Sequence, residues 1–401
     1  MKAIATRLGI SQASSGMITG VFLPFFGAYL AWRGLSAGQI GLLLSSALLL
    51  RAVTGPASGI IADAHNDRRS VMLVLYWIVF VGFGTLSFTD SSILIFLAAI
   101  PAYVAYGAAT PLLESVCVRL SERYSFDYGR VRIWASAAFV MMNVVSGLCA
   151  RWLGLVVVAP MLAAGAALCI YSTLMLPAPP PREDGSALLP RLKATFAETR
   201  ELVGSGVFLL FLMAASFEQA SHAFYYGYGG LHWRELGYSE TLIGIIWPLG
   251  VLTEIVLFSQ SLRILRLFGP ARLILLGGLV CILRWTIMSF DPPLPLVVFT
   301  QFLHGFTFAL GHLGAVFFIL RAVPPRLAAT AQSLYFVCSQ GIVMGLATFV
   351  SGSLYGALGG RTYSLMAVMA AISMGLVLIL ERRWHGERII HGAHDEHVDT
   401  I

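Results

Sequence analysis

The sequence predicts an all-α membrane protein in which twelve transmembrane helices form two six-helix bundles related by a parallel repeat. Composition, the lengths of the apolar segments and a motif that occurs twice predict this fold class. Of the 401 residues, 58% are hydrophobic and 11% are charged, and the mean hydropathy is +0.81. Because about 25% of the residues of a soluble domain are charged, this composition indicates that most of the chain lies in lipid.

Apolar segments of about 18 residues or more can cross the ~30 Å hydrocarbon layer as helices, because a helix satisfies its own backbone hydrogen bonds. We find twelve such segments, bounded by Gly, Pro and Arg. In chain order they are residues 8–31, 37–62, 70–89, 93–118, 130–150, 155–176, 205–229, 239–260, 271–290, 294–320, 328–353 and 362–381. No short basic leader with a small-residue cleavage site precedes the first segment, so we expect the first helix to serve as its own signal.

The distribution of Lys and Arg predicts the orientation of the chain. With the N-terminus in the cytoplasm, 20 of the 26 basic residues lie in cytoplasmic segments, four lie in outer loops, and Arg51 and Arg284 lie inside helices. We therefore expect a multi-pass protein of the bacterial inner membrane with both termini in the cytoplasm. The formal net charge of +6 follows from this topology and requires no nucleic-acid partner.

The repeated motif indicates two equivalent halves. GLSAGQIGLLL at 34–44 and GYSETLIGIIW at 237–247 share a Gly, a Ser two places later and an Ile-Gly pair before an apolar run, at an offset of 203 residues. Each half has an even number of helices, so both halves have the same orientation, as in transporters whose substrate site lies between two bundles. A Pro-rich and then charged sequence separates the halves and predicts a linker with a short amphipathic helix. The expected parts are an N-terminal bundle at 1–176, a cytoplasmic linker at 177–204, a C-terminal bundle at 205–382 and a cytoplasmic tail at 383–401.

Few ionisable residues lie within the predicted helices, and each is costly there unless it is paired or hydrated. They are Arg51, Glu114, Glu218, His222, Glu254, Arg284, His304 and His312, with Arg132 at the start of the fifth helix. Three carboxylates balance three arginines, so an anionic substrate would enter without strain only if a carboxylate took up a proton. Arg51 and Glu254 are also 203 residues apart, which places opposite charges at equivalent depths of the two halves. Pairs that only hold helices together are the alternative interpretation.

Two of the helices carry polar side chains at helical spacing. Glu218, His222 and Tyr225 follow each other at i, i+4 and i+7, which predicts one polar stripe. His304 and His312 are expected on one side of the tenth helix, with Phe308 between them. Hydrogen-bonded packing of these histidines is the alternative.

The sequence predicts neither a metal site nor an enzyme. The five cysteines lie in or near apolar segments without CxxC spacing, and the four histidines of the tail have no second ligand cluster. We find no Walker-type phosphate loop, no His-Glu-x-x-His and no sizeable soluble domain. We therefore expect no cofactor, with a membrane sensor or an integral-membrane enzyme as the alternative to a transporter.

The loop after the second helix, GIIADAHNDRRS, contains Gly59, Asp63, Arg68 and Arg69. It resembles the cytoplasmic signature of the major facilitator superfamily, Gly-x-x-x-Asp followed by a basic cluster, although Ala64 replaces the usual basic residue and the usual Gly is absent. The resemblance implies a gate, in which Gly59 permits close helix approach and Asp63 caps a helix or pairs with Arg. A weaker copy, RILRLFGPAR, lies at 263–272, where the repeat requires it.

Longer segments are similar to the phenylpropionate permease branch of this superfamily and, more distantly, to lactose permeases. They include VFLPFFGAYL (21–30), TPLLES (110–115), DYGRVRIWAS (127–136), AFYYGYGGLHW (223–233) and QFLHGFTFALGHLGA (301–315). The resemblance covers nearly the whole membrane domain. It implies proton symport by alternating access.

In lactose permeases a Glu on helix four and an Arg on helix five, eighteen positions apart, contact the substrate, and Glu114 and Arg132 have that spacing. Arg284, His304 and Glu254 match three residues of the coupling machinery, and the first two are twenty positions apart as the match requires.

The match fails at the residue that carries the proton. Thr307 occupies the position of the usual Glu, and Gln301 replaces the usual Lys. We therefore expect Glu218 or Glu254 to carry the proton, with His222 as a further member of the coupling group.

The aromatic content bears on the substrate. Rings gather on helices one, seven and eight, at Phe22, Phe25, Phe26, Tyr29, Tyr225, Tyr226, Tyr228 and Trp247. Arginine beside aromatic surface suits a small aromatic acid, whereas a sugar needs many hydrogen-bonding groups. The expected substrate-binding residues are Glu114, Arg132, Arg51, Phe25, Tyr29, Tyr225 and Trp247. Packing or anchoring at the membrane interface is the alternative role for such rings.

The sequence thus predicts a monomeric proton symporter that imports a small organic acid, such as a phenylpropionate-like compound. A sugar or nucleoside symporter is the first alternative. A drug/proton efflux antiporter is the second, although the segment MMNVVSGLCARW lacks the Gly-Pro-Gly-Gly signature usual in such proteins.

Overall fold

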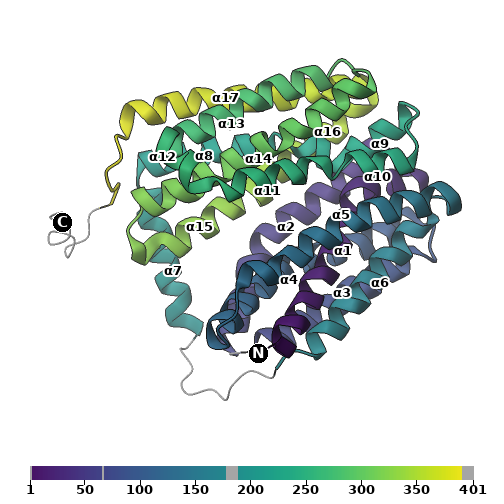
Figure 1. The fold of residues 1–401 in the computed structure, drawn as a ribbon, viewed down its shortest axis with the longest axis horizontal. Coiled ribbons are helices and arrows are strands. Elements are labelled where there is room, and N and C mark those ends of the chain that lie inside the picture. Colours follow the sequence, from purple (N-terminus) through teal and green to yellow (C-terminus); the bar gives the residue numbers. More distant parts are fainter. Residues whose placement is uncertain (1, 66, 178–187, 391–401) are drawn as a thin grey trace. The chain divides into compact units, whose positions relative to one another are not determined.

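The computed structural model describes residues 2–65, 67–177 and 188–390. This part of the chain is helical, without a strand among its residues (Figure 1). Eleven segments are long and apolar enough to cross a membrane, and the last of them, Pro325–Arg383, contains the two predicted helices 328–353 and 362–381. The prediction of an all-α membrane protein with twelve spans is therefore confirmed. The Pro-rich first part of the predicted linker, 178–187, and most of the predicted tail, 391–401, lie outside the described residues.

The helices pack into two units, and the first unit comprises Met1–Leu188, Ala223–Leu249 and Gly345–Gly360. Its elements are α1 (Lys2–Trp32), α2 (Ala37–Ala64), α3 (Arg68–Leu86), α4 (Ser92–Arg123), α5 (Tyr128–Leu153), η1 (Leu155–Val157), α6 (Val158–Leu174), α9 (Ala223–Glu235), α10 (Glu240–Ile246) and α16 (Met344–Leu358).

The second unit comprises Leu189–His222, Gly250–Met344 and Arg361–Ile401. Its elements are α7 (Leu188–Val203), α8 (Gly206–Ala220), α11 (Leu249–Ser259), α12 (Ser261–Phe268), α13 (Pro270–Met288), α14 (Leu294–Ala322), η2 (Pro325–Leu327), α15 (Ala328–Phe336), the π-helix η3 (Val337–Val343) and α17 (Tyr363–Arg383). The short helix η4 (Gly359–Thr362) contains the boundary between the units.

The packing units do not coincide with the two halves of the sequence, because three spans contribute to both units. Each of these spans changes its helical geometry close to the boundary. A turn at Ser221–His222 separates α8 from α9, a turn at Trp247–Pro248 separates α10 from α11, and the π-helix Val337–Val343 precedes α16. Proline lacks a backbone N–H and a π-helix loosens the regular hydrogen bonding, so these are the points where the spans can bend.

Side chains of the loops fix several helix starts. Ser36 caps α2 and exchanges hydrogen bonds with Gln39 in a capping box. Asp67 caps α3 by accepting hydrogen bonds from the backbone N–H and hydroxyl of Ser70 at 2.9 and 2.5 Å. Partial burial disfavours the charge of Asp67, but these hydrogen bonds outweigh it and lower its pKa. The start of α3 is therefore fixed by the side chain of Asp67.

Glycines allow α1 and α9 to pack with their backbones in contact in the first unit. A Cβ atom added at Gly230 of α9 would overlap the carbonyl group of Pro24 in α1, and one at Gly27 would overlap the carbonyl of Gly227. Close approach through small residues is the usual way in which membrane helices associate, since lipid offers no hydrophobic driving force.

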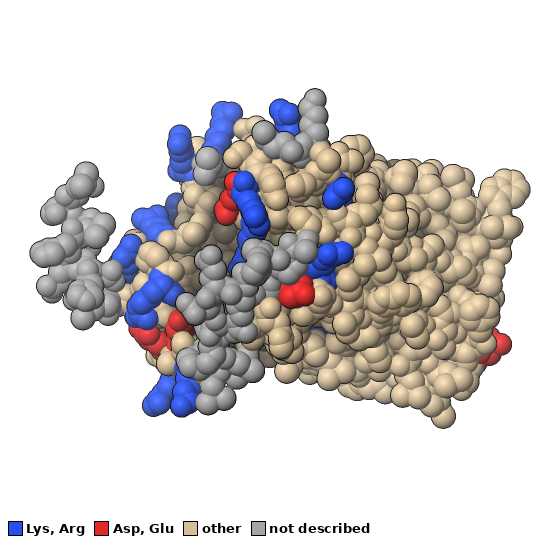
Figure 2. Space-filling view, turned by 90° about the horizontal axis from the view of Figure 1, so that it is seen from below, with Lys and Arg blue, Asp and Glu red and all other residues tan. Residues whose placement is uncertain are grey.

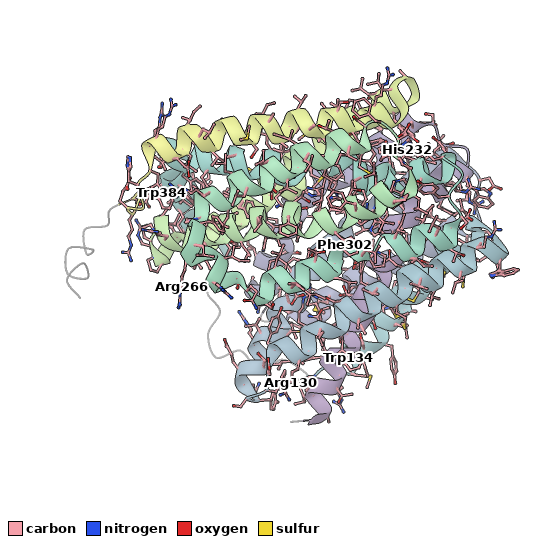
Figure 3. All side chains as sticks on the ribbon, turned by 45° about the horizontal axis from the view of Figure 1, so that its top comes forward. Arg130, Trp134, His232, Arg266, Phe302 and Trp384 are labelled. Atoms are coloured by element: carbon pink, nitrogen blue, oxygen red, sulfur yellow. The ribbon has the colours of Figure 1, made fainter. Side chains whose placement is uncertain are left out.

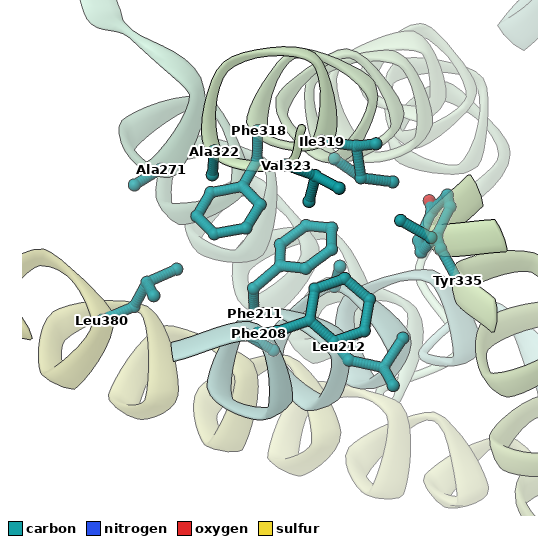
Figure 4. Close-up of a cluster of buried hydrophobic side chains, with 14 of the residues drawn as sticks. Phe208, Phe211, Leu212, Ala271, Phe318, Ile319, Ala322, Val323, Tyr335 and Leu380 are labelled. Carbon is teal, nitrogen blue, oxygen red and sulfur yellow. The ribbon is translucent and has the colours of Figure 1, made fainter. Parts of the chain in front are cut away.

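A cluster of buried aromatic and aliphatic residues holds the second unit together (Figure 4). The rings of Phe211 in α8 and Phe318 in α14 stack with centroids 4.1 Å apart. Tyr335 of α15 and Leu380 of α17 belong to the same cluster. This packing fixes α8 against α14. The two helices also carry buried polar residues outside this cluster.

The predicted amphipathic helix of the linker is present as α7. Its Leu202 is buried in the cluster of Figure 4. Glu201 forms an ion pair with Arg326, and Glu198 accepts a hydrogen bond from Thr330. The guanidinium of Arg326 lowers the pKa of Glu201. The end of the linker is thus attached to the second unit.

The surface of the molecule suits a lipid environment. On the face drawn in Figure 2, Lys and Arg gather toward the left end of the view, and most of the remaining surface is uncharged. Large apolar side chains are exposed along the helices, including Val53, Val81 and Leu97. Apolar patches of this extent would be unusual on a soluble monomer.

Candidate functional site

The second unit contains a cluster of buried polar residues that we call the polar chain. Its members are Glu218, Gln219 and His222 at the end of α8, Glu254 on α11, Arg284 on α13, and His304 and Thr307 on α14. Each is buried except Glu254, whose side chain is 16% exposed. Burying so many polar groups is costly unless they bond to one another.

The first part of the polar chain runs from α11 through α14 to α13. Glu254 Oε1 lies 3.1 Å from His304 Nε2. The other ring nitrogen of His304, Nδ1, lies 2.8 Å from Arg284 NH1, which also donates to the hydroxyl of Thr307 at 3.3 Å. The structure thus brings together the three residues that the resemblance places in the coupling machinery.

The second part continues to α8. His222 Nε2 lies 2.9 Å from the Thr307 hydroxyl, and His222 Nδ1 lies 3.1 Å from the backbone oxygen of Gln219. The side-chain amide of Gln219 donates to Glu218 Oε2 at 2.7 Å. Glu254 and Glu218 are therefore the two ends of one continuous series of polar contacts.

The contacts of His304 define its tautomer. A guanidinium can only donate, so Nδ1 of His304 must accept from Arg284 and carries no proton. Its Nε2 then carries the hydrogen and donates it to Glu254. A second proton could enter the ring only if the bond to Arg284 broke.

Thr307 has one hydroxyl hydrogen and two acceptors within reach. It lies 2.9 Å from the backbone oxygen of His304 and 2.9 Å from His222 Nε2. If the hydroxyl donates to the oxygen, His222 must donate from both nitrogens and is protonated. If it donates to His222, that ring is neutral. Rotation of one hydroxyl can therefore accompany a change in the protonation of His222.

The carboxyl group of Glu218 occupies space left by two glycines. A Cβ atom added at Gly311 of α14 would overlap this group, and one at Gly277 of α13 would lie 3.2 Å from its Oε1. The thiol of Cys281 lies 4.0 Å from the same oxygen. Among the described residues, no cation hydrogen-bonds to Glu218, so the amide of Gln219 is its main polar partner.

Aromatic rings also hold the side chain of Arg284 in place. Its guanidinium carbon lies 4.2 Å from the ring centroid of Trp285, a cation–π geometry. Trp285 stacks on Tyr363 of α17 at 5.6 Å and donates from its indole nitrogen to Ser221 at 3.2 Å.

One predicted stripe is present and the other is wrong. His304, Phe308 and His312 stack in series along α14, with centroids 6.0 and 5.9 Å apart, on one side as expected. Glu218, His222 and Tyr225 do not form one stripe, because the turn at Ser221–His222 interrupts the helix and Tyr225 belongs to the first unit.

The first unit contains the Glu and Arg pair that the resemblance places at the substrate. Arg132 Nε lies 2.9 Å from Glu114 Oε1, and both side chains remain partly exposed. Glu114 Oε2 also accepts from the hydroxyl of Tyr128 at 2.5 Å and from the amide of Gln12 at 3.2 Å. The contact between α4 and α5 that the resemblance implies is therefore present.

Arg51 of α2 is partly buried and makes no hydrogen bond or ion pair with another residue of the described ranges. Its side chain runs over Gly107 of α4, where a Cβ atom would overlap it. Tyr103, one turn away on α4, packs against Phe22 of α1 in a tilted arrangement, with ring centroids 4.5 Å apart. A cation inside a membrane span without a protein partner is a candidate for binding an anion.

Several of the predicted ring positions have packing roles in the first unit. Tyr29 is buried, and its hydroxyl donates to the backbone oxygen of Leu86 at 2.7 Å. Tyr225 and Trp247 stack on each other at 4.4 Å with an interplanar angle of 11°, and both are buried. Phe25 is also buried. A role for these rings in substrate binding stays a prediction.

The predicted gate residues lie around the loop between α2 and α3. Asp63 forms an ion pair with Arg68. Arg69 donates to the backbone oxygens of Thr173 and Leu174 at the end of α6, at 3.2 and 2.7 Å. A basic residue at a helix C-terminus is favourable. No described atom lies within 4 Å of a Cβ added at Gly59, and the expected close helix approach at this glycine stays a prediction.

Sequence reasoning missed the neutral connectors of both sites. Gln12 and Tyr128 complete the coordination of Glu114, and Gln219 and Thr307 join the ionisable residues of the polar chain. A possible signal was present in Gln12 and Gln219, since amides within apolar spans need partners. Thr307 was identified only as the residue in the position of the usual Glu, and its role as a connector gave no signal, because threonine is common in membrane helices.

This fold, with buried ionisable residues in helices that cross a membrane, defines a multi-pass membrane transporter. The chain belongs to the MFS_1 like family, whose model matches residues 17–385.

Two relatives are similar to this chain along nearly its whole length. A probable 3-phenylpropionic acid transporter of Escherichia coli (strain K12) is 27% identical, over 89% of this chain and 93% of the relative. A maltose permease of Geobacillus stearothermophilus is 26% identical, over 91% of each chain.

Solved structures share the fold. The nucleoside transporter NupG superposes with a TM-score of 0.79 at 18% identity, covering 94% of this chain and 98% of that one. A D-xylose-proton symporter superposes with a TM-score of 0.69 at 16% identity, covering 96% and 97% of the two chains. At these identities the likeness concerns the fold alone.

Proposed function

We propose that this protein is a proton symporter of the bacterial inner membrane that imports a small organic acid, such as a phenylpropionate-like aromatic carboxylate. Both termini would lie in the cytoplasm, the coupling ion would be the proton, and the monomer would act without a cofactor or covalent chemistry. The observation that carries this proposal is the polar chain, which joins the buried Glu218 and the partly buried Glu254 through polar contacts of two histidines and an arginine.

The proton would be held at the ends of the polar chain. Glu218 is fully buried without a cation bonded to it, and a charge in such a place is costly, which favours the protonated acid at rest. Glu254 is less buried and accepts from His304, so it can hold a charge more easily. A proton taken up or released at either carboxyl group would change the charge at that end of the polar chain. His222 and Thr307 can rearrange their hydrogens in response, whereas Arg284 only donates and would not carry the proton from one end to the other.

The substrate carboxylate would bind to Arg51. This arginine is partly buried in a span and has no ion pair within the described ranges, whereas Arg132 is already bonded to Glu114. The neighbouring rings of Tyr103 and Phe22 could pack against an aromatic group. The similarity to the probable 3-phenylpropionic acid transporter supports an acid of this kind.

A sugar or nucleoside symporter is the second candidate. Glu114 is surrounded by Gln12, Tyr128 and Arg132, a set of donors and acceptors that would suit hydroxyl groups. The similarity to a maltose permease, and the fold shared with NupG and a D-xylose-proton symporter, support this alternative.

Uptake by the purified protein in proteoliposomes separates the two candidates. With the interior alkaline, we expect labelled 3-phenylpropionate or a related aromatic acid to accumulate above its external concentration, and labelled maltose, xylose and uridine to remain at background. Collapse of the pH gradient with a protonophore should remove the accumulation. Accumulation of a neutral sugar or nucleoside instead of the acid would show that the second candidate is correct, and binding without accumulation would indicate a sensor.

Replacing Arg51 by Gln is expected to weaken binding of the aromatic acid by about 10- to 100-fold, because a hydrogen-bonded charge pair contributes roughly 1.5–3 kcal/mol. Arg51→Lys should recover part of the loss, since a point charge cannot reproduce a planar fork. Isothermal titration with the acid and with its neutral amide measures the effect.

Arg151→Gln, at the exposed end of α5, is the matched control and should bind the acid like the parent. Arg51→Gln should change the affinity for the amide much less than the affinity for the acid. Equal losses for acid and amide would assign Arg51 a structural role.

A further inference from the structure

Two open pockets lie next to each other in the second unit, where α12, α13, α14 and α17 end or begin. The first has a volume of about 560 Å³ and the second about 450 Å³. They share one wall, formed by Phe268, Gly269, Pro270 and Arg321. No residue of the polar chain lines either pocket, so the proposed transport function does not account for them.

Arginines give both pockets a positive charge. Arg266 and Arg321 line the first pocket, and Arg272, Arg321 and Arg382 line the second. Glu381 is the only carboxylate in either lining, and it is bonded to Arg272 at 3.4 Å. The cations therefore exceed the anions by three, which favours an anionic ligand.

Two of these arginines have no competing partner. Arg266, labelled in Figure 3 at the end of α12, and Arg382 at the end of α17 are exposed and make no hydrogen bond or ion pair with another residue of the described part of the chain. Arg321 uses its Nε to donate to the backbone oxygen of Gly386 at 3.2 Å, which fixes its position on the shared wall. An anion placed there would lie on the wall that the two arginine-lined pockets share.

Apolar side chains continue from the first pocket along the helices. Leu267 and Phe268 of α12 are 67% and 44% exposed, and Leu320 of α14 is 65% exposed. A short helix with arginines on one side and leucine and phenylalanine on the other is typical of segments that lie in the membrane interface. A free inorganic anion would leave this apolar surface unused.

We propose that the two pockets bind an anionic phospholipid, with its phosphate against Arg266, Arg321 and Arg382 and an acyl chain along Leu267, Phe268 and Leu320. The arginines then contact the charged headgroup of the lipid, and the apolar side chains contact its acyl chain. A zwitterionic lipid would bring its own cation into the arginine cluster and would bind less tightly. The site is distinct from the proposed substrate and proton sites.

The test is lipid binding to the full-length protein in detergent. Native mass spectrometry and thermal unfolding are recorded during titration with phosphatidylglycerol, phosphatidylcholine or inorganic phosphate. The parent should retain phosphatidylglycerol and melt at a higher temperature with it than with phosphatidylcholine. The double variant R266Q/R382Q should lower the apparent affinity for phosphatidylglycerol about 25-fold, or about fivefold for each arginine removed.

The double variant R263Q/R383Q is the matched control. It removes the same charge from the same two helices, and neither Arg263 nor Arg383 lines a pocket. Its affinity for phosphatidylglycerol should stay within about twofold of the parent. The proposal is overturned if both double variants lose affinity equally, if R266Q/R382Q loses none, or if inorganic phosphate alone stabilises the parent as much as the lipid.

Discussion

Replacing Glu218 by Gln is expected to abolish substrate accumulation driven by a pH gradient, while exchange of labelled for unlabelled substrate continues. Glutamine has the shape of glutamate and can still accept the hydrogen bond that Gln219 donates at 2.7 Å, so the packing of α8 against α14 should be kept. It cannot bind or release a proton. Transport steps that need no net proton movement should therefore survive, and only the coupling should be lost. Proteoliposomes measure both quantities, as accumulation under a gradient and as counterflow without one.

Glu254→Gln tests the other end of the polar chain. The amide oxygen can still accept from His304, whose contact with Glu254 is 3.1 Å, so a loss of accumulation would again point to the proton and not to the fold. Glu122→Gln, at the exposed end of α4, serves as the control and should accumulate substrate like the parent. If the Glu218 and Glu254 variants both accumulate substrate at the parental level, neither residue carries the proton and the proposed coupling is wrong.

The fold could be predicted from the sequence because the bilayer restricts the possible structures. Apolar length alone identifies a span, since a helix is the structure that satisfies its backbone in lipid. All twelve predicted segments lie on helices. Common N-cap residues such as Ser36 and Asp127 precede the first residues of these helices. The breaks within the helical spans could not be predicted in this way. A turn at Ser221–His222 lies within a continuous apolar and polar pattern that is compatible with an unbroken helix.

The ionised members of the site could also be predicted, because a charge within a span is rare and needs a reason. Spacing and resemblance placed Glu114 with Arg132, and both contacts of His304, to Glu254 and to Arg284, are present in the structure. Their roles in transport remain to be tested.

The neutral parts of the site depend on the packing of helices that are distant in sequence. Thr307 connects two histidines only because α8 and α14 are held together by the cluster around Phe211. The lack of an ion pair at Arg51 within the described ranges is likewise a result of packing in the first unit, whereas its sequence position shows only that a charge there is costly. Sequence therefore predicts which residues need partners, and packing decides which partner each receives.

Gly230→Ala is expected to destabilise the protein and to remove most of its transport activity. The added methyl group would overlap the backbone carbonyl of Pro24, and a backbone group cannot move aside as the end of a flexible side chain can. Overpacking usually costs about 1–3 kcal/mol, and contact with backbone places this case at or above the upper end. Since α9 packs on α1 at this glycine and joins α8 through the turn at Ser221–His222, a shift of α9 would also disturb the end of the polar chain. Gly356→Ala on α16 is the control, because no atom of the described residues lies within 4 Å of a Cβ there and alanine favours the helix by about 1 kcal/mol. Thermal unfolding in detergent and uptake in proteoliposomes should both separate the two variants. A Gly230→Ala protein that melts and transports like the parent would show that α1 and α9 need not touch at this point.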